Sequence, residues 1–364
     1  MSRPPRVLVL TASVGAGHDI PAARLARGIH ERRPDASVDI VDVLDVMGPL
    51  VHRAAEDTMR RTFGGNRLHW VFDAQYLLFA RTAPFRAVGQ SALYRSAGSR
   101  LLAEVQRRRP DVVVSVYPAA TEVLGRLRRT RRLDAKAVAV ITDLSSLWYW
   151  ASRGIDLHLV THPESLSEVE RIAGTGRAEA VRGLYDERFL DPPRQAAARH
   201  ALALPPVGAV IVVSGGGWGV GDIAGAVDVC HTQPGATVLA LAGTNTALQD
   251  RLERLHAGRA RVLPFVDDMP TLLAAADVLV HSTAGLTVLE ALLVGCRPIS
   301  YGWGVGHIRL NDRAYRRLGL ARVAASRDEL RRAVSLALRD PREPLAPRFA
   351  TLPHAADLVL ELTA

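Results

Sequence analysis

The sequence has little of what marks a secreted, metal-binding or membrane-spanning protein. Its two cysteines, Cys230 and Cys296, have neither a second cysteine nor a histidine at the spacing of a metal site. No uninterrupted apolar run approaches the ~20 residues that span a bilayer. The first residues lead straight into a short apolar strand, without the apolar core of a secretory leader. We therefore expect a cytoplasmic protein with buried, reduced thiols and no metal.

Lysine is also nearly absent, because Lys136 is the one lysine among 46 basic residues. Residues 1–190 hold 28 Lys and Arg against 21 Asp and Glu, whereas the remainder holds 18 against 16. GC-rich codon usage could explain the preference for arginine, but it does not explain this asymmetry. A basic half suits nucleic acid or an anionic membrane surface. Since no recognisable nucleic-acid-binding module accompanies it, we expect a membrane and no nucleic acid.

The length of the chain and the positions of two proline pairs predict two α/β domains. A chain of 364 residues, 48% hydrophobic and 23% charged, is too long for one typical core. Alternating strands and helices start at Arg6–Ala12 and start again after two proline pairs, which predicts parallel sheets. The bounds that we predict are a first domain at 1–190, a linker at 191–206, a second domain at 207–345 and a C-terminal tail at 346–364.

The second domain contains a predicted anion-binding turn. The apolar residues 274–280 indicate a buried strand, Ser282–Gly285 interrupt it, and a helix follows from Leu286. The first N–H groups of a helix have no intrahelical partner, and the helix dipole favours negative charge there. A phosphate at Gly285–Thr287 and a ribose on Glu290 would form a nucleotide-diphosphate site. The alternative is an ordinary strand–helix unit with an exposed Glu290.

A glycine-rich turn lies earlier in the same domain. Five of the seven residues in 215–221 are glycines, and Trp218 stands among them. Glycines allow positive φ and a close approach of the backbone to a phosphate. A flexible loop is the alternative, which the tightly flanking strand and helix make weaker.

In the first domain, His18 stands where a predicted first strand passes into a helix. Asp42, in a second strand predicted at Val38–Asp45, lies about where the ribose-binding acid of a dinucleotide site would be, ~20 residues on. However, Ile20 occupies the position of the third glycine of that motif. A histidine with a free pKa near 6.5 is largely neutral at pH 7 and could take a proton from an attacking hydroxyl. A purely structural His18 is the alternative.

Aromatic and basic residues alternate between residues 52 and 95. Seven aromatic side chains, Trp70 and Tyr76 among them, are interleaved with seven arginines. This composition is typical of an amphipathic segment at a membrane interface. A helix packed on its own domain has the same composition and is the alternative.

The run FVDDMPTLLAAADVLVHSTAGLTVLEALLVGCRPI, residues 265–299, resembles the donor-site signature of the GT-B glycosyltransferases of family 28. That family includes the monogalactosyldiacylglycerol synthases and the N-acetylglucosaminyltransferase that makes peptidoglycan lipid II. The loop Gly15–His18 is similar to the loop that opens their acceptor domain. The resemblance implies an α/β GT-B fold, with two Rossmann-like domains whose parallel sheets face across a cleft.

The resemblance also implies an activity. It is an inverting transfer of a hexose or N-acetylhexosamine from a UDP-sugar to a hydroxyl of a lipid such as diacylglycerol, with no cofactor and no metal. The enzyme would lie in the cytoplasm or peripherally on the inner face of the cell membrane. The alternatives are transfer to a natural product, a nonhydrolysing sugar-nucleotide epimerase, and a non-catalytic sugar-nucleotide-binding protein.

This chain departs from the family pattern at two places. Asp143 matches a Thr-Asp motif, but the histidine that should follow is absent until His158, so Asp143 is a second acceptor-site group, the orienter of His18, or a cap. His307 and Ile308 replace a Gln-Glu pair that contacts the donor sugar in lipid galactosyltransferases, which leaves the sugar open.

The resemblance implies three sets of site residues. The catalytic residues are His18 and Asp143. The UDP-sugar-binding residues are Gly216, Gly217, Trp218, Phe265, Val266, Met269, Ser282, Ala284, Gly285, Leu286, Thr287, Glu290, His307 and Asn311. The acceptor-binding residues are Gly15, Gly17, Trp70, Tyr76 and Trp148.

Overall fold

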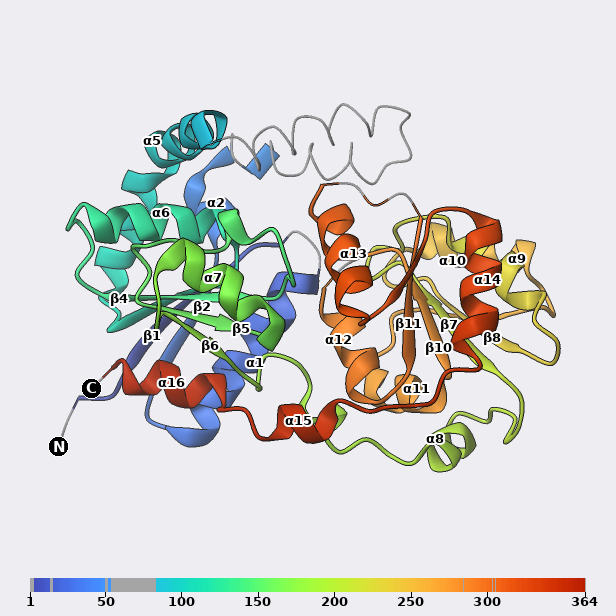
Figure 1. The fold of residues 1–364 in the computed structure, drawn as a ribbon. Helices are drawn as coiled ribbons and strands as arrows, with labels where there is room; N and C mark the ends of the chain where they lie inside the picture. The colour runs from blue at the N-terminus through green and yellow to red at the C-terminus, as the bar shows by residue number, and fades with distance from the viewer. Residues whose placement is uncertain are drawn as a thin grey trace. The chain divides into compact units, whose positions relative to one another are not determined.

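The computed structural model describes residues 3–13, 16–49, 52–53, 83–283, 285–302, 304 and 306–363. The chain divides into two compact units. Unit 1 comprises Met1–Tyr185 together with Leu352–Ala364, and unit 2 comprises Asp186–Thr351. Each unit is built around one parallel sheet with helices on both faces (Figure 1).

The sheet of unit 1 has six parallel strands in the order β2-β1-β3-β4-β5-β6. The central strands are buried along nearly their whole length, as expected of a sheet covered on both faces. The strands are β1 (Arg6–Thr11), β2 (Ser37–Asp42), β3 (Val112–Ser115), β4 (Lys136–Ile141), β5 (Leu157–Val160) and β6 (Ala178–Ala180). The helices are α1 (Ala16–Arg32), α2 (Val43–Met47), α5 (Ala83–Arg108), α6 (Pro118–Arg129), α7 (Leu166–Ala173) and α16 (Ala355–Glu361).

The sheet of unit 2 also has six parallel strands, in the order β12-β11-β10-β7-β8-β9. Its strands are β7 (Val210–Ser214), β8 (Thr237–Leu241), β9 (Arg261–Leu263), β10 (Val278–His281), β11 (Arg297–Tyr301) and β12 (Arg322–Ala324). Its helices are α8 (Gln195–Ala201), α9 (Ile223–His231), α10 (Thr246–Leu255), α11 (Met269–Ala275), α12 (Leu286–Leu293), α13 (His307–Leu318), α14 (Arg327–Ala337) and α15 (Ala346–Ala350). The predicted α/β class with parallel sheets is confirmed.

The second strand is shorter than the sequence pattern predicts. Strand β2 ends at Asp42, and the next residues form α2, so the prediction of strand up to Asp45 is wrong. Asp42 causes the change, because its carboxylate accepts a hydrogen bond from Leu44 N at 2.8 Å and caps the new helix.

The C-terminal residues belong to unit 1. Arg182 pairs with the backbone at His354, and α16 packs against α1, so red α16 lies beside blue α1 in Figure 1. A Cβ at Gly28 or Gly183 would stand 2.7 or 2.3 Å from the His354 ring. Two glycines therefore make the room for the ring that anchors the tail.

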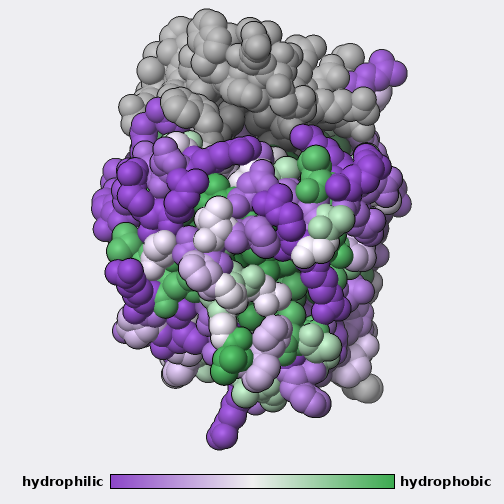
Figure 2. Space-filling view, turned by 90° about the vertical axis from the view of Figure 1, so that its right-hand side faces the viewer, coloured by the Kyte–Doolittle hydropathy of each residue, from purple (hydrophilic) through white to green (hydrophobic). Residues whose placement is uncertain are grey.

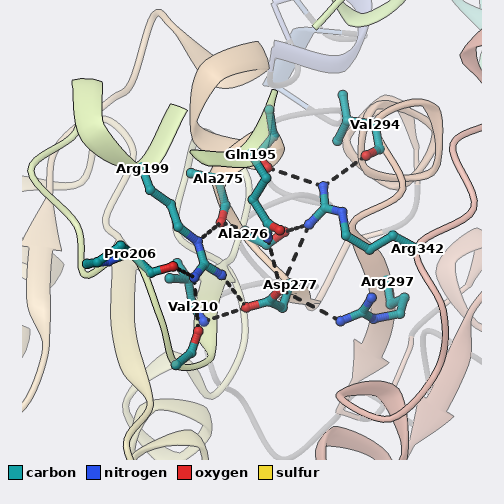
Figure 3. A network of polar contacts seen from close by, with 12 residues as sticks. Gln195, Arg199, Pro206, Val210, Ala275, Ala276, Asp277, Val294, Arg297 and Arg342 are labelled. Carbon is teal, nitrogen blue, oxygen red and sulfur yellow. Dashed lines mark hydrogen bonds and ion pairs between the residues drawn. The ribbon is translucent and has the colours of Figure 1, made fainter. Parts of the chain in front are cut away.

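A charged network ties the start of β10 to two distant segments of unit 2 (Figure 3). Asp277 accepts hydrogen bonds from Gln195 Nε2 at 2.9 Å and Arg199 Nη2 at 2.7 Å, both in α8. Arg342, after α14, lies 4.0 Å from the same carboxylate and donates to Val294 O at 2.9 Å. Residues 191–206, predicted as a linker, thus contain α8 and are held on the sheet of unit 2.

One face of the molecule and the described helices bear on whether the chain could cross a membrane. Figure 2 looks onto the face that is at the right in Figure 1, where hydrophilic residues surround smaller groups of hydrophobic ones. Within the described ranges, no helix is both long and apolar enough to cross a bilayer.

Candidate functional site

In unit 1, His18 stands at the point where the strand order reverses. The chain runs from β1 to β2 on one side and to β3 on the other, and ligands of open α/β sheets bind at the carboxyl ends of such neighbouring strands. His18, in the first turn of α1, places Nδ1 2.8 Å from the carbonyl oxygen of Val116, which directly follows β3. Because a carbonyl only accepts, Nδ1 carries the proton and Nε2 holds the lone pair of the neutral ring.

Two aromatic rings flank the His18 imidazole. The Tyr117 ring meets it edge-on with centroids 5.3 Å apart, and the Trp150 ring lies 5.8 Å away. Both residues follow strands of the same sheet edge, because Tyr117 follows β3 and Trp150 follows β4. The half-buried His18 ring thus lies between two aromatic side chains.

Asp143 follows β4 at this edge and is 8% exposed. Its Oδ2 accepts a hydrogen bond from Trp150 Nε1 at 2.9 Å. The carboxylate of Asp143 therefore contacts the indole that lies beside the His18 ring.

Asp42 stands where a dinucleotide site would need its acid, but its carboxylate accepts hydrogen bonds from the backbone. Its two oxygens accept hydrogen bonds from Ser13 N at 3.0 Å and from Leu44 N. Asp42 thus shapes the loop after β1. It also contributes to raising the pKa of Tyr117, although burial is the larger cause.

The strand order of unit 2 reverses between β7 and β10, and two of the predicted phosphate-binding turns meet there. Ser282 Oγ donates to Val220 O, and Ser282 N lies 3.3 Å from Ser214 O. The glycine-rich turn is tightly folded, with positive φ at Gly216, Gly219 and Gly221, and a Cβ at Gly221 would stand 2.6 Å from Ser282. Only glycine fits there without displacing the neighbouring turn.

Helix α12 starts at this meeting point. Its N-cap, Gly285, has φ 123° and ψ −156°, and no side chain of the described residues caps the helix. The first N–H groups of such a helix, here those of Leu286 and Thr287, can bind an anion. Glu290, one turn further, is 9% exposed.

His281, just before this turn, is completely buried. Burial lowers the pKa of its imidazole to about 4, and its neutral Nδ1–H donates to the Thr283 carbonyl. The ring therefore holds the turn without adding charge to it.

Two exposed aromatic side chains stand on two loops of unit 2. Trp218, in the glycine-rich turn, is 41% exposed, and Phe265, after β9, is 47% exposed. Thr244 bonds to Gly217 O through both N and Oγ1, at 2.8 and 2.9 Å, which fixes the glycine-rich turn to the loop after β8. Val266 is half-buried, as is Met269, the first residue of α11.

The remaining residues that were predicted to bind the UDP-sugar, His307 and Asn311, lie in the first half of α13. His307 is exposed, whereas Asn311 is fully buried and its amide donates to His307 O at 2.9 Å. Asn311 therefore holds the first turn of the helix that presents His307.

The structure describes only some of the predicted acceptor residues, and one predicted donor residue, Ala284, is also outside the described ranges. Gly17, the second residue of α1, is exposed, and Trp148 is half-buried with Arg171 Cζ 6.0 Å from its ring centroid. Gly15, Trp70, Tyr76 and Ala284 lie outside the described residues, as does most of the segment 52–95.

Sequence reasoning missed three residues around His18. Val116, Tyr117 and Trp150 were not singled out as site residues, although each follows a strand of the sheet. The signal that could have found them is the rule that side chains after β1, β3 and β4 share one edge.

Both cysteines are buried, and burial raises the pKa of each thiol to about 12. The part of the chain that the structure describes contains no group of three or more His, Cys, Asp and Glu side chains that could hold a metal ion.

Comparisons with known proteins give a consistent set of relatives. A family model described as monogalactosyldiacylglycerol (MGDG) synthase matches residues 68–180. The processive diacylglycerol beta-glucosyltransferase of Bacillus subtilis (strain 168) is 23% identical over 359 residues, covering 92% of this chain and 87% of that protein.

A second relative comes from Salinibacter ruber. It is the UDP-N-acetylglucosamine--N-acetylmuramyl-(pentapeptide) pyrophosphoryl-undecaprenol N-acetylglucosamine transferase, 27% identical over 346 residues, with 88% of this chain and 84% of that protein covered. Among solved structures, MurG of Acinetobacter baumannii has a TM-score of 0.59 at 15% identity, over 99% of each chain. This likeness shows the fold, in agreement with the two Rossmann-like domains that the sequence predicts.

Proposed function

We propose that this chain is a GT-B glycosyltransferase of family 28. It would transfer a sugar from a UDP-sugar to a lipid. The sugar is a hexose or N-acetylhexosamine, and the acceptor is a hydroxyl of a lipid such as diacylglycerol. The relatives in B. subtilis and S. ruber are named for glucosyl transfer to diacylglycerol and for N-acetylglucosamine transfer to an undecaprenol-linked lipid. Both are matched over most of their length, which supports the same reaction class here.

The observation that carries the donor half is the contact between two turns of unit 2. The glycine-rich turn after β7 and the Ser282–Gly285 turn after β10 bond to each other beside the uncapped start of α12. Backbone N–H groups fixed in this way can stabilise the charge that develops on a leaving diphosphate. We therefore propose that UDP binds here and that no metal or other cofactor is needed.

The acceptor half rests on His18. In an inverting transfer, the acceptor hydroxyl attacks the anomeric carbon while the bond from that carbon to the UDP oxygen breaks. His18 Nε2 takes the hydroxyl proton as the new bond forms, which a ring held through Nδ1 is oriented to do. Tyr117 and Trp150 keep the ring in an apolar setting.

A UDP-release assay tests this function. Purified protein is mixed with a panel of UDP-sugars and a total lipid extract, and UDP and new glycolipid are measured together. We expect equimolar UDP and glycolipid for at least one sugar. Interconversion of UDP-sugars without acceptor would instead indicate an epimerase, and binding without turnover a sugar-nucleotide-binding protein.

Glu290 is expected to hold the nucleotide ribose. Glu290→Ala should weaken UDP binding by about 1.5–3 kcal/mol, the range for hydrogen bonds to a charged group. Calorimetry measures the loss, with Glu253→Ala on the outer helix α10 as the control. Unchanged UDP affinity in folded Glu290→Ala would remove the assignment.

The basic first half is expected to attach the enzyme to the anionic inner face of the membrane, without binding nucleic acid. Co-sedimentation with vesicles should require anionic lipid and weaken with salt, because charge attraction is screened within ~8 Å at physiological ionic strength. Arg95→Glu, at an exposed position of α5, should weaken vesicle binding by about 1 kcal/mol or more. Arg251→Glu, exposed on α10 of unit 2, is the matched control, and equal binding to neutral and anionic vesicles would contradict the proposal.

A further inference from the structure

The pair formed by Trp150 and Asp143 is buried at the sheet edge that carries His18. Trp150 is 6% exposed, and its Nε1 donates to Asp143 Oδ2 at 2.9 Å. A hydrogen bond to an ionised carboxylate is stronger than one between neutral groups, and it fixes direction as well as distance. The carboxylate therefore sets the orientation of the indole.

The loop that carries this pair is itself fixed to the helix after β5. Glu168, in α7, accepts hydrogen bonds from Leu147 N at 3.1 Å and Ser145 Oγ at 3.2 Å. Ser165 Oγ donates to Leu144 O at 2.9 Å, and Trp150 N donates to Leu147 O at 2.9 Å. Four positions of the segment from Leu144 to Trp150, which includes the 3-10 turn Leu147–Tyr149, are thus held by hydrogen bonds, and these bonds fix the backbone that carries the indole.

His18 is oriented from two directions by this edge. The Val116 carbonyl holds Nδ1, and the Trp150 indole lies 5.8 Å from the ring, tilted by 39°. In a histidine–carboxylate dyad the carboxylate would accept the hydrogen bond from Nδ1–H. Here the backbone carbonyl has that place, and the carboxylate of Asp143 holds the indole instead.

We propose that Trp150 is the positioning residue of His18, and that Asp143 acts on His18 through Trp150 instead of as its dyad partner. The inference rests on the proposed function, because it assigns how the general base of that reaction is held. Neither residue takes or gives the proton. Together they keep Nε2 of His18 aimed at the acceptor hydroxyl.

Four variants test the assignment in the UDP-release assay. Trp150→Phe and Asp143→Ala should each lower kcat by about 10–100-fold, the cost of a misplaced catalytic group, with the KM for the UDP-sugar unchanged. Asp143→Asn should recover about tenfold of the Asp143→Ala loss, because its amide oxygen still accepts from the indole. The double variant Trp150→Phe/Asp143→Ala should be no slower than Trp150→Phe alone, since residues that act as a unit are not additive.

Two kinetic results would overturn the assignment. If Asp143→Asn is as slow as Asp143→Ala, the carboxylate charge is what His18 needs, as in a dyad. If the losses in the double variant multiply, the two residues act separately. Thermal unfolding followed by circular dichroism shows that unit 1, which contains both substituted residues, remains folded, and UDP calorimetry shows that unit 2 is unaffected.

A spectroscopic measurement separates this inference from the proposed function. Nitrogen-15 NMR of the full chain gives the tautomer of His18, whose signals are identified by their loss in His18→Gln. We expect protonated Nδ1 and bare Nε2 in the wild type and in Asp143→Asn. A bare Nδ1 in the wild type, or a changed tautomer in Asp143→Asn, would refute the positioning role. Absence of turnover with every donor and acceptor would refute the function alone.

Discussion

His18→Ala is expected to lower kcat by about 10²–10⁴-fold, the usual contribution of a general base. A hydroxyl has too high a pKa to attack a sugar carbon readily, so its proton must leave as the bond forms. UDP affinity should stay within about twofold of the wild type, because the predicted donor residues lie in the other unit. Steady-state kinetics with UDP calorimetry measure both quantities.

His30→Ala is the matched control for this variant. His30 lies on the same helix and bonds through Nδ1 to the Ala26 carbonyl, but it is exposed and is far along the chain from the sheet edge. Its loss should leave kcat unchanged. Turnover by His18→Ala within a few-fold of the wild type would make His18 structural, and a joint loss of UDP binding would contradict the division of roles between the units.

Asp277→Ala is expected to lower the free energy of unfolding by about 3–5 kcal/mol, because it leaves the buried Arg199 and two half-buried arginines without their countercharge. Arg199 is buried and pairs with Asp277 at 2.7 Å, and Arg297 and Arg342 lie within 3.9 and 4.0 Å of the same carboxylate (Figure 3). Burial lowers the pKa of the Arg342 guanidinium, because desolvation disfavours its positive charge. Urea unfolding measures the loss.

The control for Asp277 is the more exposed pair of Arg322 and Asp340. These residues make a contact of similar length, 2.7 Å, but their side chains are 39% and 41% exposed. Asp340→Ala should therefore cost about 0–1 kcal/mol. An equally small loss for Asp277→Ala would mean that the backbone bonds of Arg199, to the carbonyls of Ala275, Pro206 and Gly208, are sufficient.

The parts of this molecule that sequence predicts best are those that short stretches determine. The strand, turn and helix around Ser282–Gly285 were predictable because apolar runs, small residues and helical spacing lie within about twenty positions. The same local reading failed after Asp42, where a capping carboxylate ends the strand three residues before the apolar pattern does.

Contacts between distant strands were beyond that reading. The carbonyl that holds His18 lies 98 residues away, and nothing in a local pattern tells which strand will be the neighbour. The same is true of the ring contact between Trp150, after β4, and His18, after β1. The strand order of the sheet shows that the residues after β1, β3 and β4 lie at one edge, which the residue pattern alone does not show.

The return of the C-terminal tail to unit 1 has a consequence for the order of synthesis. Ala355, Ala356 and Val359 of α16 contribute to the same apolar core as Leu25 and Ile29 of α1. Every residue of unit 2 has therefore left the ribosome before the core of unit 1 can close. The half of the chain that is made first is therefore completed last, and its apolar core stays incomplete while the second half is being made.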